Sequence, residues 1–234
     1  MSERILVINP NSTEAVTEQM SAALEAFRFT GGPQLICTTL HSGPPGIETQ
    51  AHVDGASANL IAWFDEEPER KRADAVVIAC FSDPGLIALR ERLTMPIFGM
   101  GTSAYLCAAA LGDRFGVISI LAGAIPRHRR AVRALGLEDR LAADLAIDLG
   151  VVELSNEDAT WKRLAAVGRQ LRDAHRVDVV IMGCAGMARY RARLAALLGI
   201  TVIDPTQAAA GMAISAVLAR RGASAAERKA AQTV

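Results

Sequence analysis

The sequence predicts an α/β protein made of two pseudo-symmetric, Rossmann-like lobes, each built on a parallel sheet. Short apolar runs typical of buried strands alternate with amphipathic helical segments along the whole chain. The order of these segments repeats in the second half. In each half the third apolar run ends on a cysteine, within "VVIACFSDPG" (76–85) and "VVIMGCAGMA" (179–188).

The composition limits the kind of protein this chain can be. It has 234 residues, of which 51% are hydrophobic, enough for a sizeable buried core. The 25 basic and 25 acidic residues balance, which argues against nucleic acid or a membrane surface as a partner. No apolar run has the length of a signal peptide or membrane span without a charge or proline. We therefore expect a cytoplasmic protein with reduced thiols.

The first half contains four expected strands and four expected helices. The strands are 4–8, 34–40, 74–79 and 95–100, and the helices are 12–27, 48–64, 86–93 and 103–112. Strands that alternate with helices in this way form parallel sheets with right-handed crossovers. We expect residues 1–100 to form the first lobe and residues 101–205 the second. A C-terminal helix, 206–234, is expected to pack back on the first lobe.

The second half repeats this order. Its expected strands are 114–120, 148–154 and 177–184, the segment 200–209 parallels 95–104 of the first half, and helices are expected at 125–136 and 156–175. In this alignment Cys80 and Cys184 fall at the same place, after the third strand and before the third helix. The two cysteines recur because the architecture recurs.

The position of these cysteines also has chemical meaning. Ligands of open parallel sheets bind beyond the carboxyl ends of the strands, so two facing lobes bring Cys80 and Cys184 into one cleft, where we place the active site. Each cysteine precedes a helix whose N-terminus favours a thiolate, so we expect partial activation without a histidine partner. Cys37 and Cys107 lie inside apolar segments, where a cysteine packs as a small hydrophobe.

Two facing thiols suit a two-base reaction. One thiolate removes a proton from a carbon centre, and the other thiol returns a proton to the opposite face of the planar carbanion. The two sulfurs are then expected roughly 7 Å apart, too far for a disulfide. No cofactor is needed, and no CxxC pair or histidine spacing indicates a metal site.

Four segments carry a resemblance to a known family. "RILVINPNST" (4–13), "VVIACFSDPGL" (76–86), "LGDRFGVISI" (111–120) and "IMGCAGMA" (181–188) resemble the hydantoin racemase branch of the aspartate/glutamate racemase superfamily. The resemblance implies two α/β domains, a homo-oligomer, and cofactor-independent racemisation of 5-monosubstituted hydantoins or allantoin. It also implies that Cys80 and Cys184 are the catalytic pair.

Several further residues are candidates for binding the substrate. The backbone N–H groups of residues after the two cysteines are placed to form an oxyanion hole: Phe81, Ser82, Ala185 and Gly186. The amide of Asn11 suits a ring with C=O and N–H groups, although helix capping explains it equally well. Ile47 matches a family loop that approaches the substrate, or else it anchors that loop.

This chain also departs from the family pattern. Ser82 replaces a more common glycine, and Thr102 and Ser103 stand where a glutamate is frequent. These differences put the substrate in doubt and leave the two bases untouched. The alternatives are an aspartate/glutamate-type amino-acid racemase and a maleate cis–trans isomerase. A different class is a non-catalytic small-molecule binding protein, and a redox sensor that links the two thiols is another.

Overall fold

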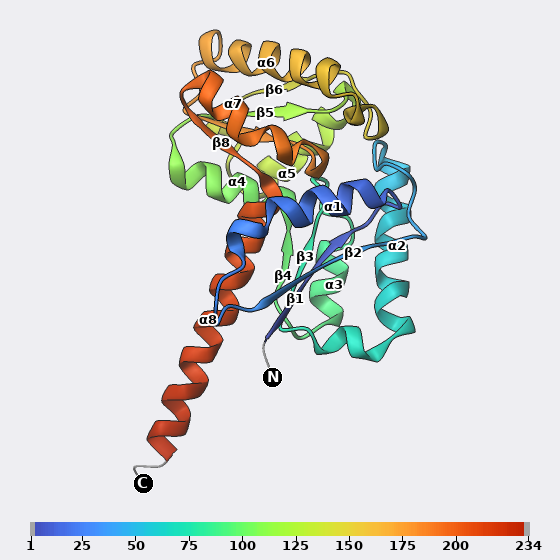
Figure 1. The fold of residues 1–234 in the computed structure, drawn as a ribbon, viewed down its shortest axis with the longest axis vertical. Coiled ribbons are helices and arrows are strands. Elements are labelled where there is room, and N and C mark those ends of the chain that lie inside the picture. The colour runs from blue at the N-terminus through green and yellow to red at the C-terminus, as the bar shows by residue number, and fades with distance from the viewer. Residues whose placement is uncertain (1–2, 232–234) are drawn as a thin grey trace.

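Two four-stranded parallel sheets form the centre of the molecule, which we describe from a computed structural model covering residues 3–231 (Figure 1). The strand order is β2-β1-β3-β4 in the first sheet and β6-β5-β7-β8 in the second. The second lobe therefore repeats the topology of the first, and the expected fold class is confirmed. Residues 232–234, the end of the expected C-terminal helix, lie outside the described residues.

The strands repeat residue by residue at the centre of each sheet. Ile5–Ile8 of β1 pair with Ala75–Ile78 of β3, and Phe115–Ile118 of β5 pair with Val179–Met182 of β7. Every residue of β3 and β7 is buried, as expected for central strands covered on both faces. The strands are β1 (Arg4–Asn9), β2 (Gln34–Thr39), β3 (Ala75–Ile78), β4 (Ile97–Gly99), β5 (Phe115–Ser119), β6 (Leu141–Ala146), β7 (Val179–Met182) and β8 (Thr201–Ile203).

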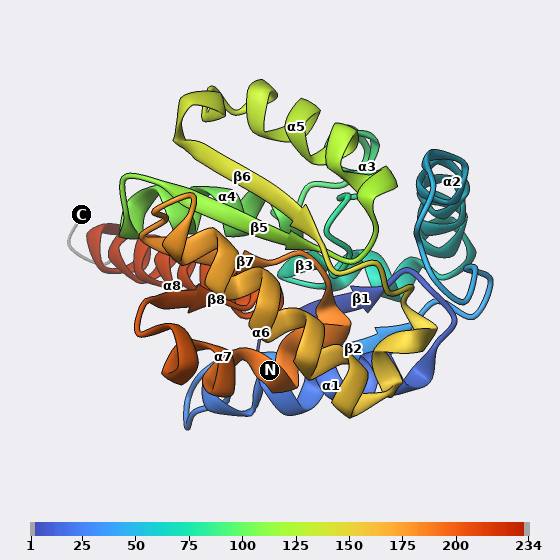
Figure 2. The ribbon, with the colours of Figure 1, turned by 90° about the horizontal axis from the view of Figure 1, so that it is seen from above.

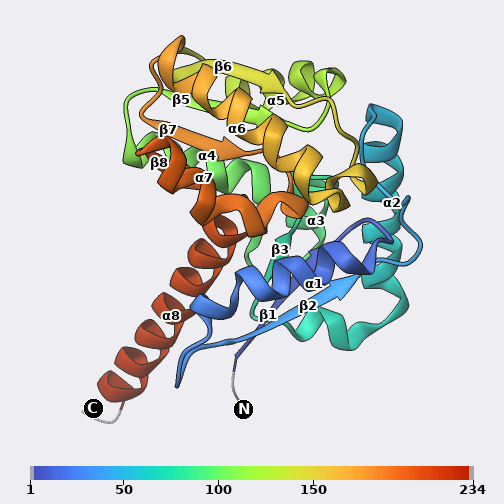
Figure 3. The ribbon, with the colours of Figure 1, turned by 45° about the horizontal axis from the view of Figure 1, so that its top comes forward.

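Helices cover both sheets and connect the lobes. They are α1 (Glu14–Ala23), α2 (Gln50–Glu66), α3 (Leu86–Arg92), α4 (Met100–Leu111), α5 (Ile125–Ala134), α6 (Glu157–Asp173), α7 (Arg191–Leu198) and α8 (Pro205–Ala231). Helix α4 contacts strands of both sheets, and α8 packs against α4 and against β3 and β4 of the first lobe. Figures 1 and 3 show α8 leaving the second lobe and running along the first.

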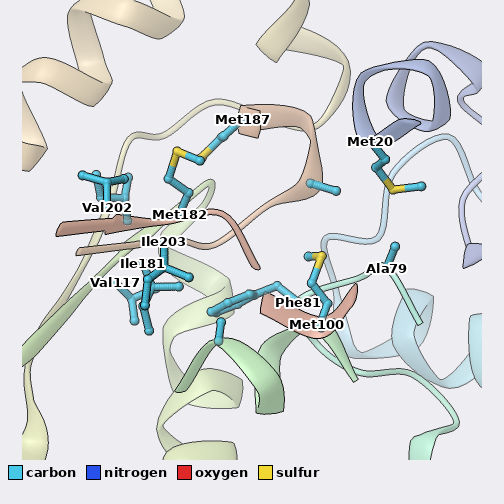
Figure 4. Close-up of a cluster of buried hydrophobic side chains, with 14 of the residues drawn as sticks. Met20, Ala79, Phe81, Met100, Val117, Ile181, Met182, Met187, Val202 and Ile203 are labelled. Atoms are coloured by element: carbon cyan, nitrogen blue, oxygen red, sulfur yellow. The ribbon is translucent and has the colours of Figure 1, made fainter. Parts of the chain in front are cut away.

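One apolar core continues from the first lobe into the second. Figure 4 shows Phe81 and Met100 between Met20 of the first lobe and Val117 and Ile181 of the second. A separate cluster fills the other face of the first sheet, beneath α2 and α3, and includes Leu60, Phe64 and Leu89. The shared core positions the carboxyl ends of the two sheets relative to each other.

The second strand of the second lobe was predicted at the wrong place. Residues 148–154 were expected to form it, but β6 is Leu141–Ala146 and is seen beside β5 in Figure 2. The β-branched residues of "GVVEL" favoured a strand, whereas β6 is rich in alanine and leucine. Pairing with β5 stops at Ala146, and the left-handed φ of Asp148 (52°) then turns the chain into a short 3₁₀ segment at Val152–Ser155.

Candidate active site

A single cavity lies at the carboxyl ends of the strands, between the lobes, and both Cys80 and Cys184 line it. It encloses about 520 Å³ of space between atoms, its open mouth included. Five other residues expected at the site also line it: Asn11, Ile47, Phe81, Ser82 and Ala185. Gly186 does not line the cavity, but its N–H donates to the Cys184 sulfur.

The two cysteines occupy equivalent turns. Cys80 comes two residues after the end of β3, and Cys184 comes two residues after the end of β7. In each turn the N–H two residues further on donates a hydrogen bond to the sulfur, from Ser82 to Cys80 and from Gly186 to Cys184. Both thiols are free, and each is half-buried at the cavity wall. The turns therefore present two sulfurs in similar backbone settings.

The expectation that helix termini activate these thiols is wrong. Burial raises the pKa of Cys80 to about 12 and that of Cys184 to about 11, and the hydrogen bonds from Ser82 and Gly186 only partly oppose it. No helix begins directly after Cys80, since α3 starts at Leu86. Cys184 precedes only a short 3₁₀ helix. Both thiols are consequently expected in the protonated form at neutral pH.

Charged neighbours distinguish the two cysteines. Asp83 raises the pKa of Cys80 beyond the effect of burial, whereas Arg127 lowers it. Glu48 and Asp204 both raise the pKa of Cys184. The two sides of the cavity thus differ in charge although the backbone turns are alike.

Asn11 is not the cap of α1. The N-cap is Thr13, and Asn11 lies two residues before it. Its Oδ1 accepts from the Thr13 N–H at 2.9 Å and from Asn9 Nδ2 at 3.0 Å, which fixes the turn after β1. Its Nδ2 makes no hydrogen bond within the described residues, so the amide can still donate to a ligand in the cavity.

Sequence reasoning missed a set of contacts that join the two lobes at the cavity. Glu48 Oε1 accepts from the Val151 N–H at 2.9 Å, and Arg127 Nη2 donates to the Glu48 carbonyl at 2.8 Å. All three residues line the cavity. Because these contacts join segments about a hundred residues apart in the chain, local patterns gave no sign of them.

His128 is a second residue that the sequence did not indicate. No histidine was expected near the thiols, yet His128 is buried and lines the cavity. Its ring lies edge-on to the ring of Phe81, with the two ring centroids 4.9 Å apart. Its Nδ1 lies 2.8 Å from Asp144 Oδ2 and 3.0 Å from Ser119 Oγ. Serine and aspartate thus share the same ring nitrogen, which is not the arrangement of a Ser-His-Asp hydrolase.

The part of the chain that the structure describes contains no group of three or more His, Cys, Asp or Glu residues arranged to hold a metal ion. None of its helices is both long enough and apolar enough to cross a membrane.

Comparison with known proteins identifies the family. The family model for Asp/Glu/Hydantoin racemase matches residues 5–213. The chain belongs to this racemase family. It is 33% identical to the hydantoin racemase of Paenarthrobacter aurescens over 217 residues, which cover 92% of this chain and 91% of that protein. It is also 33% identical to the hydantoin racemase of Rhizobium meliloti over 212 residues, covering 89% and 86%.

Solved structures of the racemase family share the fold. The allantoin racemase from Klebsiella pneumoniae has a TM-score of 0.86 and 32% identity, covering 93% of this chain and 88% of its own. A glutamate racemase from Bacillus anthracis has a TM-score of 0.67 at 18% identity, and this similarity supports only a shared fold. The protein is therefore an enzyme, an isomerase of the racemase type, and the non-catalytic alternative is set aside.

Proposed function

We propose that the protein racemises 5-monosubstituted hydantoins, allantoin included, through Cys80 and Cys184 and without a cofactor. The observation that carries the proposal is the pair of free thiols, supplied by equivalent turns of the two lobes and lining one cavity. The names of the similar proteins support the substrate class, since they are hydantoin and allantoin racemases.

In the proposed reaction the two cysteines exchange roles. The thiolate of one cysteine takes the C5 proton, and the pair of electrons from the C–H bond forms a double bond to C4 while the charge moves to the C4 oxygen. The other cysteine, as a thiol, then gives its proton to the opposite face of C5. One turnover leaves the pair with thiol and thiolate interchanged, ready for the other enantiomer.

Backbone donors support the charge that develops. The N–H groups of Phe81 and Ala185 have no hydrogen-bond acceptor among the described residues and lie next to the two sulfurs. They are candidates to bind the enolate oxygen, as is Asn11 Nδ2. The N–H groups of Ser82 and Gly186 donate to the sulfurs of Cys80 and Cys184, and they stabilise each thiolate when it forms.

The protonation of the pair follows from electrostatics. Two thiolates in one buried cavity repel each other, and the charge of Cys184 is among the causes that raise the pKa of Cys80. The reactive form in this proposal carries one proton and one negative charge on the pair, and it arises when the doubly protonated pair loses one proton. This is the state that a two-base racemase needs.

The test is proton NMR in D₂O with one enantiomer each of 5-benzylhydantoin, allantoin and aspartate, with optical rotation followed in parallel. Hydantoins exchange spontaneously, so a sample without enzyme gives the baseline. Enzyme-dependent deuteration at C5 with loss of rotation is expected for the hydantoins and not for aspartate. Activity on aspartate alone would assign an amino-acid racemase. No activity on any of the three would refute the proposal, and maleate isomerisation would be tested next.

A further inference from the structure

Arg127 carries a charge that no carboxylate neutralises among the described residues. This side chain extends from the first turns of α5 to the cavity wall. Its Nη1 donates to the Gly123 carbonyl at 3.2 Å and its Nη2 to the Glu48 carbonyl at 2.8 Å. Its Nε is buried and has no hydrogen-bond partner in the described part of the chain.

This arrangement is incomplete without a further acceptor. The two backbone carbonyls hold the guanidinium in place but are neutral, and the negative charge that favours it is the Cys80 thiolate when that forms. Buried donors in folded proteins are nearly always hydrogen-bonded, so the unpartnered Nε of a residue that lines the cavity calls for an acceptor. An oxygen atom, neutral or anionic, would complete the arrangement.

The position of Arg127 indicates which part of a ligand it meets. The Glu48 carbonyl that it contacts belongs to a segment that runs from buried Ile47 to exposed Gln50, at the mouth of the cavity. Arg127 itself is only partly buried. In the proposed function the C4 oxygen binds the backbone donors of the two cysteine turns, and on that basis we place the group attached to C5 toward Glu48 and Arg127 at the mouth.

We propose that Arg127 is a specificity-determining residue that binds an acceptor oxygen, a carbonyl or a carboxylate, on the 5-substituent of the substrate. This inference rests on the proposed function, since it takes the hydantoin ring to lie between Cys80 and Cys184. It goes further by assigning a substrate preference to a side chain outside the reacting pair. Substrates with purely apolar 5-substituents leave the guanidinium unmatched and should be poorer.

Three substrates of nearly equal size and shape test the proposal: 5-carbamoylmethyl-, 5-carboxymethyl- and 5-isobutylhydantoin. In the wild type, kcat/KM for at least one of the two oxygen-bearing compounds should exceed that for the isobutyl compound by about 10- to 100-fold. Arg127→Met should abolish this preference, and because Arg127 also lowers the pKa of Cys80, the ratio of kcat/KM between substrates is the readout and not the absolute rate. A greater loss for the carboxymethyl compound would assign a carboxylate, and a loss confined to the carbamoylmethyl compound or equal for both would assign a carbonyl oxygen.

Arg130→Met is the matched control. Arg130 lies on the same helix and also joins the lobes, with Nη2 donating to Gln50 Oε1 at 3.1 Å, but it does not line the cavity. It should keep the wild-type preference. Arg127→Lys, which keeps the charge, should retain part of it, and thermal melting of each variant shows that it folds.

Two results would overturn the inference. One is a wild type that prefers the isobutyl compound, and the other is an Arg127→Met variant that loses activity equally with all three compounds. A wild type that racemises no hydantoin would instead refute the proposed function. In that case calorimetric titration measures the affinity of the wild type and of Arg127→Met for both oxygen-bearing compounds. Equal affinities would show that Arg127 does not bind an acceptor oxygen of the 5-substituent.

Discussion

The turn after β3 and the turn after β7 are alike in backbone and unlike in charge. Each places a cysteine two residues beyond its strand, and each directs an N–H to the sulfur. Both cysteines have acidic neighbours, Asp83 for Cys80 and Glu48 with Asp204 for Cys184, but only Cys80 also has a basic one, Arg127, among the causes of its pKa shift. Repetition of the lobe thus supplies two similar bases, and the side chains around them make the two sides of the cavity different.

The lobes differ in the same way in their buried polar networks. In both, a polar residue that ends the first strand takes part in a network that reaches the first helix and the second strand. The members are Asn9, Thr17 and Thr39 in the first lobe, and Ser119, His128 and Asp144 in the second. The first network is neutral and the second is ionisable, so the same place in the fold accommodates different chemistry.

The largest expected effect comes from removing either base. Cys80→Ala and Cys184→Ala should each lower the racemisation rate by about 10²- to 10⁴-fold, because each removes a group that transfers a proton. Each variant should still exchange the C5 proton of one enantiomer with D₂O, and the two variants should act on opposite enantiomers. Polarimetry and proton NMR measure the two effects.

Cys107→Ala is the control for these variants, since Cys107 lies in α4 and does not line the cavity. It should racemise at the wild-type rate. Exchange of the same enantiomer by both alanine variants would contradict the assignment of one cysteine to each face.

The next effect tests the difference between the polar networks. Asp144→Ala should lower the free energy of unfolding by about 2–4 kcal/mol, because it leaves buried His128 and Ser119 without their shared partner. Thr39→Val in the neutral network should cost about 1 kcal/mol. Urea denaturation at pH 7 measures both, and equal losses would show that the ionisable network is no more important to stability than the neutral one.

A smaller effect concerns a carboxyl near Cys184. Burial raises the pKa of Asp204 from 3.8 to about 6, although the N–H groups of Gln207 and Thr206 donate to it. One of its oxygens, Oδ2, is buried without a hydrogen-bond partner among the described residues. The folded state therefore binds a proton more tightly than the unfolded state, and the associated stability is lost as the pH rises from about 4 through 6.

Asp204→Asn should remove this pH dependence and keep the cap of α8, since asparagine also caps helices. At pH 8 the variant should be more stable than the wild type by about 1–2 kcal/mol, below the upper limit of roughly 3 kcal/mol that the pKa shift sets. Denaturation at pH 4, 6 and 8 tests this. If the free energy of unfolding changed between pH 4 and 8 by the same amount in the wild type and in Asp204→Asn, the assignment of this pH dependence to Asp204 would be wrong.

The smallest expected effect concerns Glu48. Glu48→Gln keeps an oxygen that can accept from the Val151 N–H but removes the negative charge that raises the pKa of Cys184. Alkylation of Cys184 by iodoacetamide at pH 8 should become about 2- to 5-fold faster, with little change at Cys80. Mass spectrometry follows each cysteine separately, and equal acceleration at both would show that Glu48 does not distinguish them.

The sequence by itself determined the features that depend on local pattern and on repetition. Fully apolar runs identified the central strands β3 and β7, and their repetition predicted two lobes and a pair of equivalent cysteines. The same reasoning misplaced β6, because an edge strand rich in alanine depends on its pairing with β5 more than on its own propensity. A β-branched segment, 148–154, was taken for a strand although it lies beyond the end of that pairing.

Only the tertiary structure decided the electrostatics of the site. The high pKa values of Cys80 and Cys184 come from burial between two lobes, and desolvation cannot be read from the residues adjacent in sequence. Arg127 lines the cavity and binds a loop of the first lobe, some eighty residues away in the chain, and His128 packs against Phe81 of that lobe. Charge and hydrogen bonding act through space, so the residues that make the two sides of this cavity different became visible only when the lobes were brought together.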